Sequence, residues 1–299
     1  MSCDSAALRF MQLSDPQFGM YRSLSRRSPE KRAAIWRRFR RINLVGPEDP
    51  EVPEGITGMQ PEIERLSYAL DEANRSRPAF VAICGDLVNN PDEDDQADAL
   101  RECIRTLSPA IPLRCVPGNH DLSTNFKRPT SDGLSAYRQH FGDDYYVFQS
   151  EQVTVLALNS ETLYGPEEVP GEDTRQLEFV ADTLRARETR ESRELIVLMH
   201  RPLFVRPPVA GRPPNMNAGR SALYDLFENC ALRTTLFCGH LHQNRYVALD
   251  GFEQVISGPV GFPLRGVPGW REVRVGASVN HRYRPFDLAR TSASDAPDA

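Results

Sequence analysis

Five apolar runs in this chain are each followed at once by a short polar motif that carries aspartate, asparagine or histidine. The motifs read SDPQ at 14–17, GDLVN at 85–89, GNHD at 118–121, HRP at 200–202 and GHLH at 239–242. Several of the preceding runs are β-branched and apolar throughout, as is typical of strands buried on both faces. Ligands of α/β sheets gather in the crevice beyond the carboxyl ends of the strands. We therefore expect the five motifs to meet in one crevice.

The spacing of apolar residues predicts an α/β protein with helices packed on sheet faces. We expect strands at 8–13, 80–84, 111–116, 145–148, 153–158, 195–199 and 235–238. We expect helices at 61–76, 96–107, 174–187 and 219–229. From about residue 244 the pattern changes, and four short runs follow without a helix between them, at 245–249, 252–256, 272–275 and 279–283. They predict a meander that finishes a second sheet.

The segment between the first strand and the first clear helix, at about 18–60, does not fit this alternation. From Arg22 to Arg41 it holds nine basic residues and one acid, Glu30. Its apolar residues recur at helical spacing and predict an amphipathic helix: Ile35, Trp36, Phe39 and Ile42. Such a helix suits a membrane surface or an anionic ligand. The alternative, which we favour, is an inserted helix whose apolar stripe packs on the domain.

Length and composition set the remaining limits. A chain of 299 residues can bury a sizeable core, and we expect one domain over 1–290 with a disordered tail at 291–299. The net charge of −5 argues against a general nucleic-acid partner, and no apolar run is long enough for a transmembrane segment. We see no signal peptide, and the six cysteines form no CxxC pair, which favours reduced thiols and a cytoplasmic location. Oligomeric state is left open.

The residue types in the motifs predict a site for two metal ions. Aspartate, an asparagine carbonyl and neutral imidazole suit Mn, Fe or Zn better than a metal that prefers thiolates. The set is too large for one tetrahedral site, and a carboxylate can bridge two ions, which makes Asp86 the candidate bridge. Four of the six histidines fall in these motifs. Glycines at 85, 118 and 239 would let the backbone approach the ions without a side-chain clash.

These motifs, in this order, resemble the calcineurin-like metallophosphoesterase superfamily, whose signature is D-x-H, G-D, G-N-H-D/E, H and G-H-x-H. The resemblance covers roughly residues 8 to 285. The stretches SDPQFG, FGDDYY and LNS further resemble one subgroup, the calcineurin-like phosphoesterase domain-containing protein 1 type, described as a protein serine/threonine phosphatase. The resemblance implies two mixed β-sheets packed as a sandwich and flanked by helices, in four αββα layers.

The resemblance also implies roles for individual residues. A first metal would be bound by Asp15 and His242, both metals by Asp86, and the second metal by Asn119, His200 and His240. His120 would protonate the leaving-group oxygen or stabilise the phosphate, with Asp121 orienting its ring, and Asn119 would also contact the phosphate. A histidine held by a carboxylate remains available as an acid near neutral pH. Arg201 directly follows a ligand and is a further candidate for binding phosphate oxygens.

The chain departs from the signature at Gln17, which stands where the family supplies a histidine. A glutamine carbonyl is a weaker ligand for a transition metal than imidazole. We therefore expect two divalent metal ions, Mn, Fe, Zn or Mg, with the first held less tightly than the second.

The expected function is hydrolysis of phosphate monoesters, on a phosphoprotein or a small phosphorylated metabolite, by attack of a metal-bound hydroxide. One alternative is a phosphodiesterase acting on cyclic nucleotides or phospholipid headgroups, which the substitution at Gln17 disfavours. An alternative of another class is an inactive metal-binding scaffold, which would have no need of His120 and Asp121.

Overall fold

The strands form two mixed sheets that pack face to face. The computed structural model describes residues 7–41, 45, 54–125, 127–205, 216–264 and 267–287. A five-stranded sheet has the order β11-β10-β1-β2-β3, and a six-stranded sheet has the order β4-β5-β6-β7-β9-β8. The strands are β1 (Leu8–Leu13), β2 (Phe80–Cys84), β3 (Leu113–Val116), β4 (Tyr146–Ser150), β5 (Val153–Ala157), β6 (Glu194–Leu198), β7 (Thr234–Cys238), β8 (Arg245–Leu249), β9 (Phe252–Ile256), β10 (Gly269–Val275) and β11 (Val279–Pro285).

An apolar core lies between the two sheets. Phe10 of β1 and Phe80 of β2 stack with ring centroids 4.6 Å apart, and Phe237 of β7 meets the Phe10 ring edge-on at 5.6 Å. These side chains belong to one buried cluster with residues from both sheets. Burial of such aromatic and β-branched side chains contributes roughly 1.5–3 kcal/mol each. The core therefore fixes how the two sheets, and the loops at their ends, face each other.

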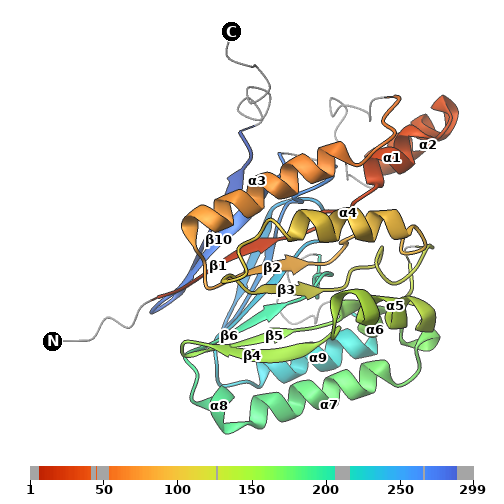
Figure 1. Cartoon of the computed structure of the whole chain (residues 1–299). Coiled ribbons are helices and arrows are strands. Elements are labelled where there is room, and N and C mark those ends of the chain that lie inside the picture. The colour runs from red at the N-terminus through yellow and green to blue at the C-terminus, as the bar shows by residue number, and fades with distance from the viewer. Residues whose placement is uncertain are drawn as a thin grey trace.

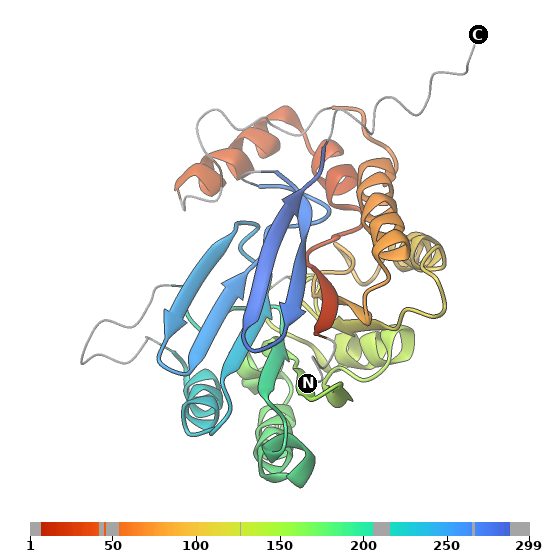
Figure 2. The same cartoon turned by 90° about the vertical axis from the view of Figure 1, so that its left-hand side faces the viewer.

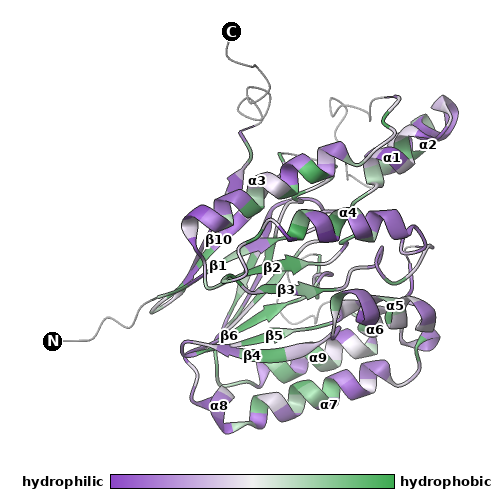
Figure 3. Ribbon diagram, viewed as in Figure 1, coloured by the Kyte–Doolittle hydropathy of each residue, from purple (hydrophilic) through white to green (hydrophobic). Residues whose placement is uncertain are grey.

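Helices cover the outer face of each sheet (Figures 1 and 2). They are α1 (Met20–Ser25), α2 (Pro29–Arg41), α3 (Gln60–Ser76), α4 (Asp94–Ile104), α5 (Ser131–Phe141), α6 (Ser160–Tyr164), α7 (Glu172–Arg185), α8 (Arg187–Arg190) and α9 (Ala218–Glu228). Helices α3, α4 and α5 share a core with the five-stranded sheet, and α6, α7 and α9 share one with the six-stranded sheet. Purple outer and green inner faces of these helices mark this amphipathic packing in Figure 3. The predicted αββα sandwich is confirmed.

The prediction of one C-terminal meander in a second sheet is wrong for half of its strands. Strands β8 and β9 do extend the six-stranded sheet. Strands β10 and β11 instead join the five-stranded sheet, where β10 runs antiparallel to β1 with Leu8 opposite Val275. Alternation of polar and apolar residues predicts a strand but not its neighbour, so the pattern left this pairing open. The tail at 291–299 lies outside the described residues.

The basic segment contains the two helices α1 and α2, and its apolar stripe packs on the domain. Trp36 is 3% exposed and belongs to a cluster with Tyr21 and Phe262, while Ile35 and Phe39 are half-buried against the same cluster. This is the alternative that the sequence favoured. Ile42 lies outside the described residues. Within the described residues no helix is both long and apolar enough to cross a membrane.

Candidate metal centre

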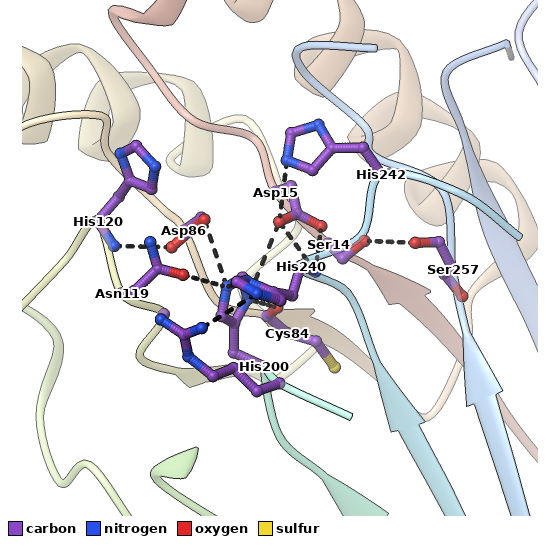
Figure 4. Close-up of polar contacts among 12 residues, drawn as sticks. Ser14, Asp15, Cys84, Asp86, Asn119, His120, His200, His240, His242 and Ser257 are labelled. Atoms are coloured by element: carbon purple, nitrogen blue, oxygen red, sulfur yellow. Dashed lines mark hydrogen bonds and ion pairs between the residues drawn. The ribbon is translucent and has the colours of Figure 1, made fainter. Parts of the chain in front are cut away.

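The carboxyl ends of the parallel strands bring the five motifs together. Strands β1, β2 and β3 are mutually parallel, as are β6 and β7. Two groups of side chains result, each with ligand atoms that lie within 4.8 Å of one another. The first is Asp15, Asp86 and His242, and the second is Asp86, His200 and His240 (Figure 4). Asp86 belongs to both groups, as expected for a carboxylate that bridges two ions.

The second group is gathered around the imidazole of His200. Its Nε2 atom lies 3.3 Å from Asp86 Oδ2, 3.1 Å from Asn119 Oδ1 and 3.2 Å from His240 Nδ1. On its other side, Nδ1 donates to the carbonyl oxygen of Cys84 at 3.0 Å. A carbonyl can only accept, so Nδ1 carries a proton, and Nε2 is the ring nitrogen that faces the centre.

The first group is built in the same way around His242. Its Nε2 atom lies 3.4 Å from Asp15 Oδ1, and its Nδ1 donates to the carbonyl oxygen of Phe262 at 2.6 Å. Gln17 is 2% exposed, and its carbonyl oxygen Oε1 is buried without a hydrogen-bond partner. Leaving a buried polar atom unpaired costs roughly 1–3 kcal/mol. A cation at this position would satisfy Oε1, so the orphaned oxygen fits a metal ligand.

The backbone at the predicted ligands adopts a conformation that side chains rarely take. Seven non-glycine residues in the described ranges have positive φ, and five of them are predicted metal ligands: Asp15, Gln17, Asp86, His240 and His242. Their φ angles lie between 50° and 69°. Such left-handed residues cost about 1–3 kcal/mol each and persist only where the surroundings hold them. Their concentration in these loops supports a functional site.

Two glycines allow the loops to approach so closely. A Cβ atom at Gly85 would lie 2.5 Å from the ring of His200, and one at Gly118 would lie 2.2 Å from Asp86 Oδ1. Both separations are too short for non-bonded atoms. Any larger residue at either position would push a predicted ligand aside, as the sequence suggested for these glycines.

The electrostatics of the centre call for cations. Asp15 and Asp86 are 0% and 2% exposed, and buried charges need an ionic partner. Burial alone would lower the pKa of His200, but the carboxylates of Asp86 and Asp15 outweigh it and raise that pKa to about 10. Burial opposes ionisation of Asp86, yet His200 and His120 hold the pKa of this carboxyl well below its usual range. The donor set of carboxylates, imidazoles and amide oxygens therefore fits divalent ions.

His120 lies beside the centre, and both its ring and its backbone contact the motif at 85–89. Its Nδ1 atom lies 2.9 Å from the carbonyl oxygen of Asn89, and its backbone N–H donates to Asp86 Oδ1 at 2.9 Å. The carboxylate of Asp121 instead accepts from the backbone N–H groups of Gly118 at 2.7 Å and Val88 at 3.0 Å. Asp121 thus ties two motif loops together, and its role in orienting the His120 ring stays a prediction.

Arg201 lies beside the centre and has a partner that the motifs did not reveal. Its Nη1 is 3.1 Å from His240 Nε2, and its Nε donates to Glu161 Oε2 at 2.7 Å. Glu161 is 1% exposed and is the second residue of α6, which Asn159 caps. The only sequence signal for Glu161 was its place directly after the stretch LNS. The contacts of the carbonyl oxygens of Asn89 and Phe262 had no signal, because any residue type offers a carbonyl.

The fold and this arrangement of ligands define the class. A model of the calcineurin-like phosphoesterase family matches residues 8–244, and the chain belongs to that family. It is a hydrolase of phosphate esters, and the family implies divalent metal ions.

Among individual relatives, the chain is similar to the serine/threonine-protein phosphatase CPPED1. It is 29% identical to the protein from Danio rerio over 95% of this chain and 86% of that protein. The identity to the Homo sapiens protein is 27%, over 93% of this chain and 83% of that protein.

Two solved structures share the fold at low identity. A purple acid phosphatase from yellow lupin (Lupinus luteus) seeds has a TM-score of 0.61 at 14% identity, covering 98% of this chain and 53% of that chain. A dimetal phosphatase from Danio rerio has a TM-score of 0.60 at 13% identity, covering 93% of this chain and 96% of that chain.

Proposed function

We propose that this phosphoesterase is a phosphomonoesterase that uses two divalent ions and acts on phosphoserine or phosphothreonine in proteins. The observation that carries the two-ion proposal is the shared carboxylate of Asp86, which belongs to both ligand groups. The similarity to relatives named serine/threonine-protein phosphatase supports the substrate class. A small phosphorylated metabolite is the alternative substrate for the same chemistry.

The proposed ligand set divides around Asp86. Asp15, Gln17 and His242 hold the first ion, Asn119, His200 and His240 hold the second, and Asp86 holds both. Bound there, the two ions supply positive charge that draws in phosphoryl oxygens and lowers the pKa of the attacking water. The donor types are compatible with Mn, Fe, Zn or Mg.

Other side chains handle the substrate. Hydrolysis adds water to phosphorus and breaks the bond to the alcohol oxygen, which must gain a proton. We assign that proton transfer, or stabilisation of the phosphate, to His120. Because the Asn89 carbonyl contacts Nδ1 of this ring, Nε2 is the nitrogen that we expect to give the proton to the alcohol oxygen. We assign the binding of a phosphate oxygen to Arg201, which Glu161 holds next to His240, together with Asn119.

Two further observations support a cytoplasmic location and a single catalytic domain over 1–290. The five described cysteines are free of disulfides, as in a reducing compartment. Both sheets contribute proposed ligands to the same centre, so neither sheet alone forms the site.

The test compares hydrolysis of an aryl phosphomonoester with that of a bis-aryl diester, first with added Mn and then after chelation. We expect chelator-sensitive turnover that is much faster on the monoester. A faster diester reaction would replace the proposal by a phosphodiesterase. Absence of chelator-sensitive turnover on both compounds would instead support the alternative of an inactive metal-binding scaffold.

A further inference from the structure

The exposed face of α2 carries three arginines that the proposed catalytic centre does not use. Arg37, Arg38 and Arg41 are all exposed, and their spacing of three and four residues puts them on one face of the helix. No ion pair joins these three side chains to any other part of the described chain. By contrast, Arg32 of the same helix bonds to Glu54 and to the carbonyl oxygen of Ser25. The three arginines form a positive face on a molecule whose net charge is −5.

The helix that carries this arginine face lies at the end of the molecule toward which the strands that precede the centre point. The arrowheads of β1, β2 and β3 point toward the end at which α1 and α2 lie (Figure 1). The buried side of α2 shares a cluster with Phe262, whose carbonyl oxygen accepts the Nδ1 proton of His242. Tyr21 of α1 packs edge-on against the same Phe262 ring, with centroids 4.8 Å apart. The helix is therefore fixed to the loop that holds a proposed metal ligand.

The surface chemistry of α2 distinguishes between anionic partners. A helix that binds a bilayer inserts large apolar side chains from its free side. In α2 those side chains face the protein, since Trp36 is buried and Ile35 and Phe39 pack against the same cluster. Guanidinium groups alone remain on the arginine face, and they recognise carboxylates and phosphates in water. Charge complementarity beside the centre therefore favours an acidic polypeptide over a membrane.

We propose that Arg37, Arg38 and Arg41 bind acidic residues that flank the phosphorylated residue of a protein substrate. The inference rests on the proposed phosphomonoesterase function and deepens it, because it assigns a substrate class to the site. Ion pairs between exposed side chains are weak. An increase in peptide affinity of about twofold for each arginine gives an increase of roughly tenfold for the three together. Long-range attraction by the same face would also raise the rate of encounter at low salt.

The test compares a phosphoserine peptide flanked by Asp and Glu with the same peptide flanked by Asn and Gln. The variant is the triple Arg37→Gln/Arg38→Gln/Arg41→Gln, since glutamine preserves helix propensity. We expect wild-type kcat/KM to favour the acidic peptide, and we expect the variant to lose about tenfold of that preference. Raising the salt from 50 to 200 mM should shrink the wild-type preference as well. Turnover of an aryl phosphate should stay within about twofold, which reports that the variant is folded.

Two other variants sharpen the result. The matched control is Arg9→Gln/Arg274→Gln/Arg282→Gln, which removes the same charge from exposed positions on β1, β10 and β11. Arg9 and Arg274 are paired near the start of β1, at the far end from Asp15, so the control should keep the acidic preference. Arg201→Gln should instead weaken turnover of every substrate, including the aryl phosphate, because it changes the proposed phosphate-binding group.

Binding of a fluorescent acidic peptide without phosphate separates this inference from the proposed function. Loss of that binding in the α2 variant supports the arginine face even if no phosphomonoester is turned over. An unchanged preference in the α2 variant, or an equal loss in the control, would overturn the inference. So would loss of binding to phosphatidylserine vesicles with the peptide preference intact, which would assign the arginine face to a membrane.

Discussion

At the scale of single residues, Gln17 sets this centre apart from the family signature. It stands where the family signature has a histidine, its side chain is buried, and its Oε1 atom has no hydrogen-bond partner. The φ angle of 50° at this position is one that histidine tolerates, as His242 does at the same value. A histidine is therefore compatible with the backbone of the first site.

We predict that Gln17→His binds the first metal on the order of tenfold more tightly, because imidazole is a stronger ligand for a transition metal than an amide oxygen. Competition between the protein and a chelating dye for Mn measures the affinity. Gln17→Ala is the control and should weaken the same site. Equal affinity in Gln17→His and the wild type would contradict a ligand role for position 17.

At the scale of elements, the buried carboxyl group of Glu62 in α3 forms a hydrogen bond to the backbone of α1. Glu62 of α3 is 0% exposed; its Oε1 accepts from the backbone N–H of Tyr21 at 3.1 Å, and its Oε2 has no partner. Burial raises the pKa of Glu62, while the hydrogen bond from Tyr21 and the charge of Arg65 oppose the shift. Ionised Glu62 therefore costs stability.

The sign of the pH dependence follows from that shift. Below an unfolded pKa near 4.5, Glu62 is protonated in both states and costs nothing. As the pH rises from there through the higher folded pKa, the unfolded chain ionises first and stability falls, by about 1.4 kcal/mol for each unit between the two pKa values. Glu62→Gln should thus gain stability relative to wild type between pH 4 and pH 7. Urea unfolding at both pH values checks this, and a difference that is independent of pH would refute it.

Elements also show what the sequence was able to predict. The runs that became β2 and most of β6 were found because buried parallel strands are apolar throughout, and β1 was found although Arg9 and Gln12 interrupt its apolar residues. Helices α1, α5 and α6 escaped notice, since α1 and α6 are too short for a clear period and α5 lies in a polar stretch. Pairing of β10 with β1 was missed because partner choice depends on the whole fold. In the centre, the predicted ligands converge, whereas backbone partners such as the Asn89 carbonyl leave no trace in residue type.

At the scale of the whole molecule, the centre draws its proposed ligands from both halves of the sandwich. Asp15, Asp86 and Asn119 follow strands of the five-stranded sheet, and His200 and His240 follow strands of the six-stranded sheet. Ions bound there would bind the folded chain and not the unfolded one, and would stabilise it by mass action.

We expect removal of metal by a chelator to lower Tm by about 3–5 °C, which corresponds to roughly 2–3 kcal/mol for a chain of this size. Differential scanning calorimetry before chelation, after it and after return of Mn measures the effect. Asp86→Asn removes the shared carboxylate, so its Tm should hardly respond to the chelator. A wild-type Tm that is equal with and without metal would argue against ions held between the sheets.

The division of proposed ligands between the sheets has a consequence for the order of events during biosynthesis. A nascent chain that has completed only β1, β2 and β3 presents oxygen ligands and no imidazole ligand. These oxygen ligands alone would form a weak site that suits a hard cation such as Mg²⁺. A transition metal would gain its nitrogen ligands only once β6 and β7 have docked. We therefore expect metal loading to be a late step of assembly, with the metal acquired depending on which ions are present after the second half of the chain has emerged.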